Sequence, residues 1–182
     1  MANDTFYKSN CPYFCRIMYT IISTTNRVGS NTLKVARQYQ AFFAEESIEA
    51  QLYSLEHFTS LQRDPHFDKT EQEILIPTKK FIFIMPEYNG SFPGIFKLMM
   101  DLSDIKQSWY YKKVLLVGVA NGRAGNLRGI DSMTNMCHYM KMNVYHEKLP
   151  ISGISQELDN DAFVKESTIQ AVKNQIKGFI QF

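Results

Sequence analysis

The sequence predicts an α/β protein built on a parallel β-sheet, and three observations point to this class. Short runs rich in β-branched and aromatic residues alternate with longer segments whose apolar residues recur every three or four positions. Two of the short runs, 80–85 and 113–120, are apolar almost throughout, as strands covered by helices on both faces are. Tight polar or glycine-containing loops follow several of these runs. This alternation is typical of repeated strand–helix–strand units.

The composition is that of a globular protein, with 45% hydrophobic and 21% charged residues among 182. The net charge is +2 and the basic residues are dispersed, so the chain lacks the basic stripe of a nucleic-acid-binding protein. No stretch of about 20 apolar residues would span a membrane, and the start lacks the pattern of a secretory signal. The three cysteines form neither an even disulfide framework nor a metal-type pair. We therefore expect a cytoplasmic protein with no nucleic-acid or membrane partner and no bound metal.

Residues 1–16 are polar and aperiodic. We interpret them as a partly disordered extension that precedes one domain over residues 17–182. Cys11 and Cys15 lie in this extension with C-x-x-x-C spacing, which is not the redox-active C-x-x-C, and two exposed thiols are expected there.

The first strand–helix unit is the clearest. Residues 16–23 predict a strand, 24–29 a tight loop and 30–45 a helix. Ser30 is a natural N-cap for that helix. One side of the helix carries apolar residues, namely Leu33, Ala36, Tyr39 and Phe43.

The middle of the chain is less uniform. Residues 49–55 predict a weaker second strand, and 56–70 show no clear element. A short helix is expected to end near Pro77. The third strand is predicted over 80–85, and a helix over 93–103 with a proline in its first turn.

The last third continues the alternation. Residues 113–120 predict the fourth strand and 121–125 a glycine loop. A helix follows from Leu127 to Met140, with apolar residues at spacings of three and four. Residues 143–149 predict the fifth strand, and a helix with an apolar stripe closes the chain.

Unusual loops follow the first, third and fourth strands. The carboxyl ends of parallel strands lie at one edge of a sheet, where α/β proteins bind their ligands. The first loop, 23–32, brings hydroxyl groups, Arg27, Gly29 and the start of a helix, which are the donors that a phosphate needs. A hydroxyl-rich helix cap without a ligand is the alternative interpretation. The loop lacks the spacing and lysine of a P-loop.

The other two loops have different chemistry. The second, PEYNG at 86–90, has an acid, an aromatic ring and a sharp Asn-Gly turn, which suit a flat ring with polar edges. The third, ANGRAG at 120–125, has two glycines that allow a ligand to approach the backbone closely. Each loop taken alone is also consistent with an ordinary turn that ends a strand.

Family motifs occur in all three loops. The pattern PEYNGS-x-PG-x-x-K-x-x-x-D is present without a break over 86–101. S-x-R-x-x-S-x-N is matched in part over 25–32, with threonine at its first and last positions. S-x-G-x-x-G is matched over 120–125 with Ala120 in place of serine. With these motifs, the chain resembles the NAD(P)H-dependent FMN reductase family of flavodoxin-like proteins, which includes quinone, chromate and azo-dye reductases.

The resemblance implies a flavodoxin-like three-layer sandwich with a five-stranded parallel sheet of order 2-1-3-4-5. It implies non-covalent FMN, with NADPH or NADH as co-substrate. It also implies hydride transfer through the flavin to a quinone, free flavin, azo dye or metal oxyanion, with no catalytic side chain. A homodimer is implied, with a homotetramer as the alternative. The implied cofactor-binding residues are Thr25, Arg27, Ser30, Asn31, Thr32, Pro86, Glu87, Tyr88, Asn89, Gly90, Asn121, Gly122 and Gly125. A flavodoxin-like single-electron carrier and a non-catalytic flavin-binding module stay open as alternative functions.

Overall fold

The computed structural model describes residues 18–182, which fold around one parallel sheet. The strand order is β2-β1-β3-β4-β5, and β6 also pairs with β4. The strands are β1 (Tyr19–Ser23), β2 (Ala50–Ser54), β3 (Lys80–Pro86), β4 (Lys113–Val119), β5 (Asn143–Val144) and β6 (Leu149–Ile151). The predicted α/β class and strand order are confirmed.

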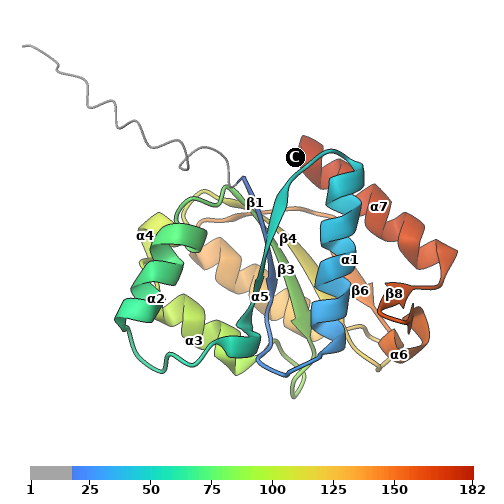
Figure 1. The fold of residues 1–182 in the computed structure, drawn as a ribbon, viewed down its shortest axis with the longest axis horizontal. Coiled ribbons are helices and arrows are strands. Elements are labelled where there is room, and N and C mark those ends of the chain that lie inside the picture. Colours follow the sequence, from blue (N-terminus) through green and yellow to red (C-terminus); the bar gives the residue numbers. More distant parts are fainter. Residues whose placement is uncertain (1–17) are drawn as a thin grey trace, which may run out of the picture.

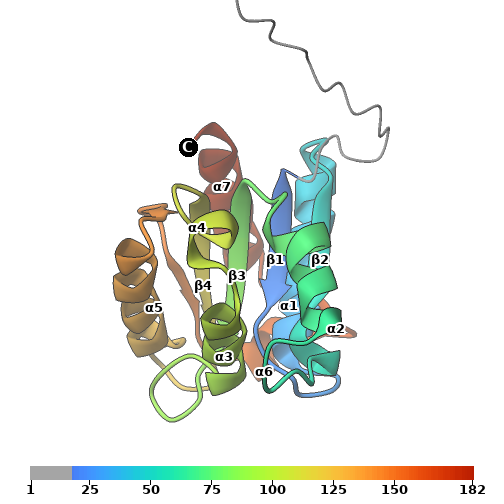
Figure 2. The ribbon, with the colours of Figure 1, turned by 90° about the vertical axis from the view of Figure 1, so that its left-hand side faces the viewer.

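Helices cover both faces of the sheet, which gives three layers (Figures 1 and 2). The α-helices are α1 (Asn31–Glu45), α2 (Pro65–Thr70), α3 (Gly94–Leu102), α4 (Ile105–Ser108), α5 (Leu127–Tyr139), α6 (Ile154–Glu157) and α7 (Glu166–Gln181). A 3₁₀-turn η1 (Leu55–His57) and a π-helical turn η2 (Glu71–Leu75) complete them. α1 and α7 pack on one face, and α2, α3, α4 and α5 on the other.

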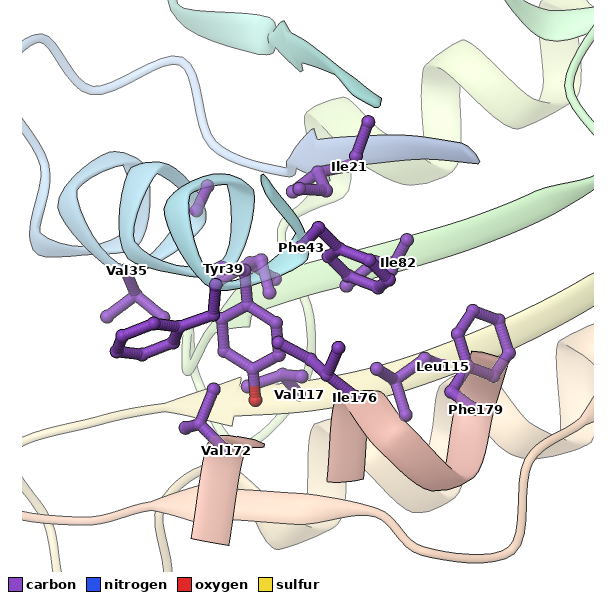
Figure 3. Close-up of a cluster of buried hydrophobic side chains, with 14 of the residues drawn as sticks. Ile21, Val35, Tyr39, Phe43, Ile82, Leu115, Val117, Val172, Ile176 and Phe179 are labelled. Carbon is purple, nitrogen blue, oxygen red and sulfur yellow. The ribbon is translucent and has the colours of Figure 1, made fainter. Parts of the chain in front are cut away.

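The central strands are apolar on both faces because each face has its own core. In β3, Ile82 and Ile84 belong to the cluster under α1 and α7, and the alternate residues belong to the opposite cluster. Figure 3 shows the first cluster, where side chains of α1 and α7 meet over β3 and β4. Tyr39 crosses this core, and its hydroxyl donates to Gln175 Oε1 at 2.7 Å. The buried polar end of Tyr39 is therefore satisfied.

The fifth strand differs from the prediction of one run over 143–149. β5 ends at Val144 opposite Val114, and β6 starts at Leu149 opposite Val117. The five-residue step from 144 to 149 thus faces a three-residue step in β4. Tyr145 N still donates to Val114 O at 2.8 Å, so the extra residues bulge between Tyr145 and Leu149. The Tyr145 ring packs in the core against the C-terminal end of α7, at 5.7 Å from the Phe179 ring.

Other elements also depart from the prediction. Residues 56–70, for which no element was predicted, contain most of η1 and the whole of α2. Pro93 is the N-cap of α3 rather than a residue of its first turn. After β6, a segment that was not predicted contains α6 and the hairpin β7 (Leu158–Asp159) to β8 (Ala162–Phe163). The predicted N-cap Ser30 is confirmed, since its Oγ accepts from Leu33 N at 3.1 Å.

The predicted extension, with Cys11 and Cys15, lies outside the described residues. Burial raises the pKa of the Cys137 thiol to about 12, so this cysteine is protonated and unreactive at neutral pH. Within 18–182, every helix is too short or too polar to cross a membrane.

Candidate functional site

The loops after β1, β3 and β4 converge on one pocket at the carboxyl edge of the sheet. Its volume is about 390 Å³. The predicted site residues that line it are Arg27, Ser30, Asn31, Thr32, Pro86, Glu87, Tyr88, Asn121 and Gly122. The structure therefore brings together residues from all three loops.

The loop after β1 is held against β3 by its threonines. The backbone N–H and the hydroxyl of Thr24 both bind Ile84 O, at 3.1 and 3.0 Å. Thr25 Oγ1 lies 2.6 Å from the Tyr88 hydroxyl and also accepts from Arg27 N at 3.3 Å. Thr25 is only 1% exposed and lies outside the pocket lining, so it acts here as a link between two loops.

The start of α1 forms one end of the pocket. Ser30 caps the helix, which leaves its hydroxyl hydrogen available to a further acceptor. Asn31 and Thr32 line the pocket and occupy the first helical positions, whose N–H groups have no acceptor within the helix. Together with the helix dipole and Arg27, these groups favour an anion at this end.

The loop after β3 is a tight hairpin. Tyr88 N donates to Ser91 O at 2.8 Å, and Ser91 N donates to Tyr88 O at 3.1 Å. Asn89 and Gly90 have φ of 53° and 73°, the left-handed pair that a two-residue type I′ turn requires. These two predicted site residues lie at the turn outside the pocket lining and set its shape, while Pro86, Glu87 and Tyr88 line the pocket.

Arg27 and Tyr88 connect the anion end to the hairpin. The guanidinium carbon of Arg27 lies 4.4 Å from the centre of the Tyr88 ring, which is a cation–π contact. Because Thr25 holds the Tyr88 hydroxyl, the ring is fixed from two sides.

The loop after β4 closes the pocket. Gly122 lines it, whereas Gly125 packs against the backbone of β6. Gly125 has φ of 56°, and a Cβ there would lie 2.6 Å from Pro150 C. Asn121 Oδ1 accepts from Ser155 N at 3.0 Å and from its hydroxyl at 2.7 Å, so this side chain ties the loop to α6.

Several residues at this site were not among the predicted cofactor-binding residues. Val119, Ile154 and Ala120, which was noted only as a motif position, also line the pocket. Ile154 comes from α6, far along the chain from the three loops, and no local sequence pattern places it here. Asn126 is a further omission, although it does not line the pocket.

Asn126 holds the end of β3 in place. Its Nδ2 donates to Met85 O at 2.9 Å and Pro86 O at 3.0 Å. The residue is fully buried and has φ of 66°. A Cβ at Gly129 would lie 2.2 Å from Asn126 Oδ1, so glycine is needed beside it. The sequence signal is the run G-N-x-x-G at 125–129, which by itself indicates only the start of a helix.

The pocket fits FMN in both chemistry and size. The phosphate requires donors and positive charge, which Arg27, Ser30 and the start of α1 supply. The flat ring requires a slot bordered by backbone polar groups, which the segments 86–88 and 120–122 provide. The volume of about 390 Å³ lies within the range of about 300–1,000 Å³ for small-molecule pockets.

Known proteins share this fold. The chain is similar to FerB from Paracoccus denitrificans, a flavoenzyme NAD(P)H:(acceptor) oxidoreductase, with 16% identity and a TM-score of 0.65 over 90% of this chain and 94% of the other. It is similar to an NADH:FMN oxidoreductase in its apo form, with 17% identity and a TM-score of 0.71 over 89% and 88% of the two chains. A flavodoxin from the domain Archaea has 12% identity and a TM-score of 0.61 over 90% and 97%. At these identities the similarity shows the fold alone.

The family is shown by sequence. Residues 18–156 match the family model described as NADPH-dependent FMN reductase, which is most of the chain. The match includes all three loops of the pocket. The chain therefore belongs to the NADPH-dependent FMN reductase family, and it is an NAD(P)H-dependent flavoenzyme whose cofactor is FMN.

Proposed function

We propose that the protein passes reducing equivalents from NADPH or NADH, through FMN held in the edge pocket, to a small-molecule acceptor. The acceptor classes are a quinone, a free flavin, an azo dye or a metal oxyanion. One observation carries the proposal: a single pocket joins a phosphate-suited helix start to a slot between two strand-end loops. That arrangement holds a flavin mononucleotide by both of its ends.

The side chains of the pocket bind and orient the cofactor. Arg27, Ser30 and the first N–H groups of α1 hold the phosphate. The backbone of 86–88 and 120–122 borders the ring. When bound, FMN supplies the group that accepts hydride from a nicotinamide and passes electrons on. The protein then requires no side-chain acid or base for this chemistry.

The first experiment is a visible absorption spectrum of the purified protein before and after anaerobic addition of NADPH or NADH. We expect the spectrum of bound flavin and its rapid bleaching, followed by turnover with a quinone or free FMN. Colourless protein that takes up no added FMN would refute the proposal. Bound flavin that NAD(P)H reduces only slowly would favour the single-electron carrier.

A pair of matched variants tests where the cofactor binds. Arg27→Ala removes the guanidinium at the anion end, and Arg37→Ala removes an exposed guanidinium on α1 that lies outside the pocket lining. We expect Arg27→Ala to weaken FMN binding about tenfold or more, the loss of one charge-assisted contact. Arg37→Ala should bind FMN like the wild type. Equal affinities in both variants would contradict this placement of the phosphate.

We also propose a homodimer in the cytoplasm, with a homotetramer as the alternative. A groove of about 350 Å³ where α3, α4 and α5 meet has Met100, Ile105, Met136 and Tyr139 among its lining residues. The Tyr139 ring is 81% exposed, and an exposed aromatic beside apolar side chains favours a protein interface. Light scattering coupled to gel filtration measures the assembly, and a monomeric mass would contradict it.

A further inference from the structure

A second pocket lies at the opposite end of the sheet, where β3 and β4 begin. Its volume is about 610 Å³. Its polar lining is dominated by Lys79, Lys80, Lys112, Lys113, Tyr110 and Tyr111. We call it the lysine pocket. α7 ends at this same edge, where β3 and β4 begin (Figure 1). The FMN pocket lies at the carboxyl ends of these strands.

The ammonium groups of Lys80 and Lys112 are held in place by backbone carbonyl groups. Lys80 Nζ donates to two carbonyl oxygens in the last turn of α7, at 2.9 and 3.2 Å. Lys112 Nζ donates to two carbonyl oxygens at the end of η2, at 2.7 and 3.0 Å. Carbonyl groups at a helix end carry only partial negative charge, so they orient these ammonium groups without neutralising them.

Two further lysines add to the positive charge. Lys79 is exposed at the rim, and among the described residues no carboxylate lines the pocket. Lys141 Nζ lies 4.8 Å from the centre of the Tyr110 ring and 5.9 Å from that of Tyr111. This concentration of charge is unusual in a chain whose net charge is only +2.

Lys112 is a buried lysine of this pocket, and its surroundings disfavour the charged form. The residue is 8% exposed. Burial, and then the positive charge of Lys79, lower the pKa of Lys112 to about 7, while the Glu71 carboxylate opposes that shift. An anion placed among these lysines would remove the repulsion and favour the ammonium form.

We propose that the lysine pocket binds phosphoryl groups, either free or carried on a small aromatic compound, at a site separate from the FMN pocket. Three features support this ligand class. Lys79, Lys80 and Lys112 all line this one pocket, an ammonium group has three donors, and phosphate accepts many hydrogen bonds. The volume admits more than a single ion. The rings of Tyr110 and Tyr111 offer apolar faces for an attached ring.

The test is calorimetric titration of the FMN-saturated protein with pyrophosphate near neutral pH, in two buffers of different ionisation enthalpy. We expect one saturable site and uptake of protons on binding, since Lys112 becomes charged. Absence of binding at millimolar pyrophosphate would overturn the proposal. Release of FMN during the titration would do the same, because it would show competition at the flavin site.

Matched variants locate the site. Lys79→Met removes the rim lysine, and Lys69→Met removes an exposed lysine on α2 that does not line the pocket. We expect binding to weaken about tenfold or more in Lys79→Met, the loss of one charge-assisted contact, and to be unchanged in Lys69→Met. Equal effects of the two substitutions would refute the assignment.

A parallel titration with ADP separates the two sources of the phosphoryl group. Tighter binding of ADP than of pyrophosphate assigns the site to aromatic phosphates, and tighter binding of pyrophosphate assigns it to inorganic ones.

Discussion

Glu56 supports the phosphate loop from outside the pocket. Its Oε1 accepts from Gly29 N at 2.6 Å, and its side chain is only 14% exposed. Gly29 has φ of 63°, so the loop turns sharply between Arg27 and the Ser30 cap. A carboxylate that accepts this backbone N–H therefore holds the loop in the shape that precedes α1.

The pair Glu56→Ala and Glu56→Gln separates this hydrogen bond from the charge. Alanine removes the acceptor and frees the loop, so we expect FMN affinity to fall by about tenfold, in line with about 1.5–3 kcal/mol for a charged hydrogen bond. Glutamine keeps an acceptor oxygen and removes a negative charge near the phosphate, so affinity should equal or exceed that of the wild type. Quenching of flavin fluorescence measures both. Wild-type affinity in the alanine variant would show that Glu56 does not position the loop.

Asn126 makes a second prediction at the residue scale, for stability. Asn126→Gly keeps the left-handed backbone available but removes the two buried hydrogen bonds that the Asn126 side chain donates to Met85 O and Pro86 O. We expect a loss of about 2–3 kcal/mol in the free energy of unfolding. Asn126→Ala adds the strain of a left-handed alanine and should lose roughly 1 kcal/mol more. Urea unfolding monitored by circular dichroism gives both values, and equal stability of the two variants would contradict the strain argument.

At the scale of elements, glycines allow the β4 loop to pack against its neighbours. A Cβ at Gly118 would lie only 2.1 Å from Gly125 O, and Gly125 itself packs against the backbone of β6. The loop, the strand β4 and the start of α5 therefore approach more closely than side chains permit. This close packing places Gly122 and Asn121 at the pocket.

Two glycines of that loop should differ in how much stability an alanine substitution costs. Gly125→Ala places a Cβ 2.6 Å from Pro150 C at a φ of 56°, so we expect more than about 2 kcal/mol of destabilisation. A Cβ at Gly122 meets nothing within 4 Å, so Gly122→Ala should change stability by less than about 0.5 kcal/mol. Thermal unfolding of the FMN-free proteins checks the contrast. A Gly125→Ala variant as stable as Gly122→Ala would show that the contact with β6 relaxes easily.

At the scale of the whole molecule, the two ends of the parallel strands carry different chemistry. The carboxyl ends carry the FMN pocket, and the amino ends of β3 and β4 carry the lysine pocket. Lysines at the amino ends also hold the last turn of α7 and the end of η2. Stability should therefore depend on pH through these groups.

The lowered pKa of Lys112 determines whether stability rises or falls with pH. Its pKa falls from 10.5 in the ordinary state to about 7 in the folded protein. The unfolded chain therefore binds the proton of Lys112 more tightly than the folded protein does. The burial of the charged amine lowers the free energy of unfolding by its full amount below about pH 7, and this loss disappears as pH rises toward 10. Stability should rise across this window, by at most about 1.4 kcal/mol per pH unit.

The control is Lys112→Met, which keeps the length of the side chain and removes the titrating amine. Denaturant unfolding at several pH values between 7 and 10 should show a less steep rise for this variant than for the wild type. The comparison is between the slopes of stability against pH, because the variant also loses two hydrogen bonds to carbonyl groups, which changes its stability at every pH. Identical slopes would show that Lys112 does not titrate in this range.

Much of the fold and part of the site were predictable because they depend on local patterns. Apolar runs that fit strands on both faces indicated β3 and β4, and the Ser30 cap indicated where α1 begins. The three loops were expected at one edge because parallel strands share a direction, and the pocket contains residues of all three. The interrupted fifth strand was not predictable, because the two parts of it pair with separate segments of β4 and this register is set only when the sheet assembles.

By itself the sequence determined the α/β class, the strand order implied by its family motifs, and the three loops that meet in the pocket. Only the tertiary structure decided that Ile154 lines that pocket and that Asn126 and Glu56 support its walls from outside. It also brought the lysines of β3 and β4 together in a second pocket. The physical reason is that periodicity and capping act between residues close in the chain, whereas these contacts join segments that become neighbours only when the sheet assembles.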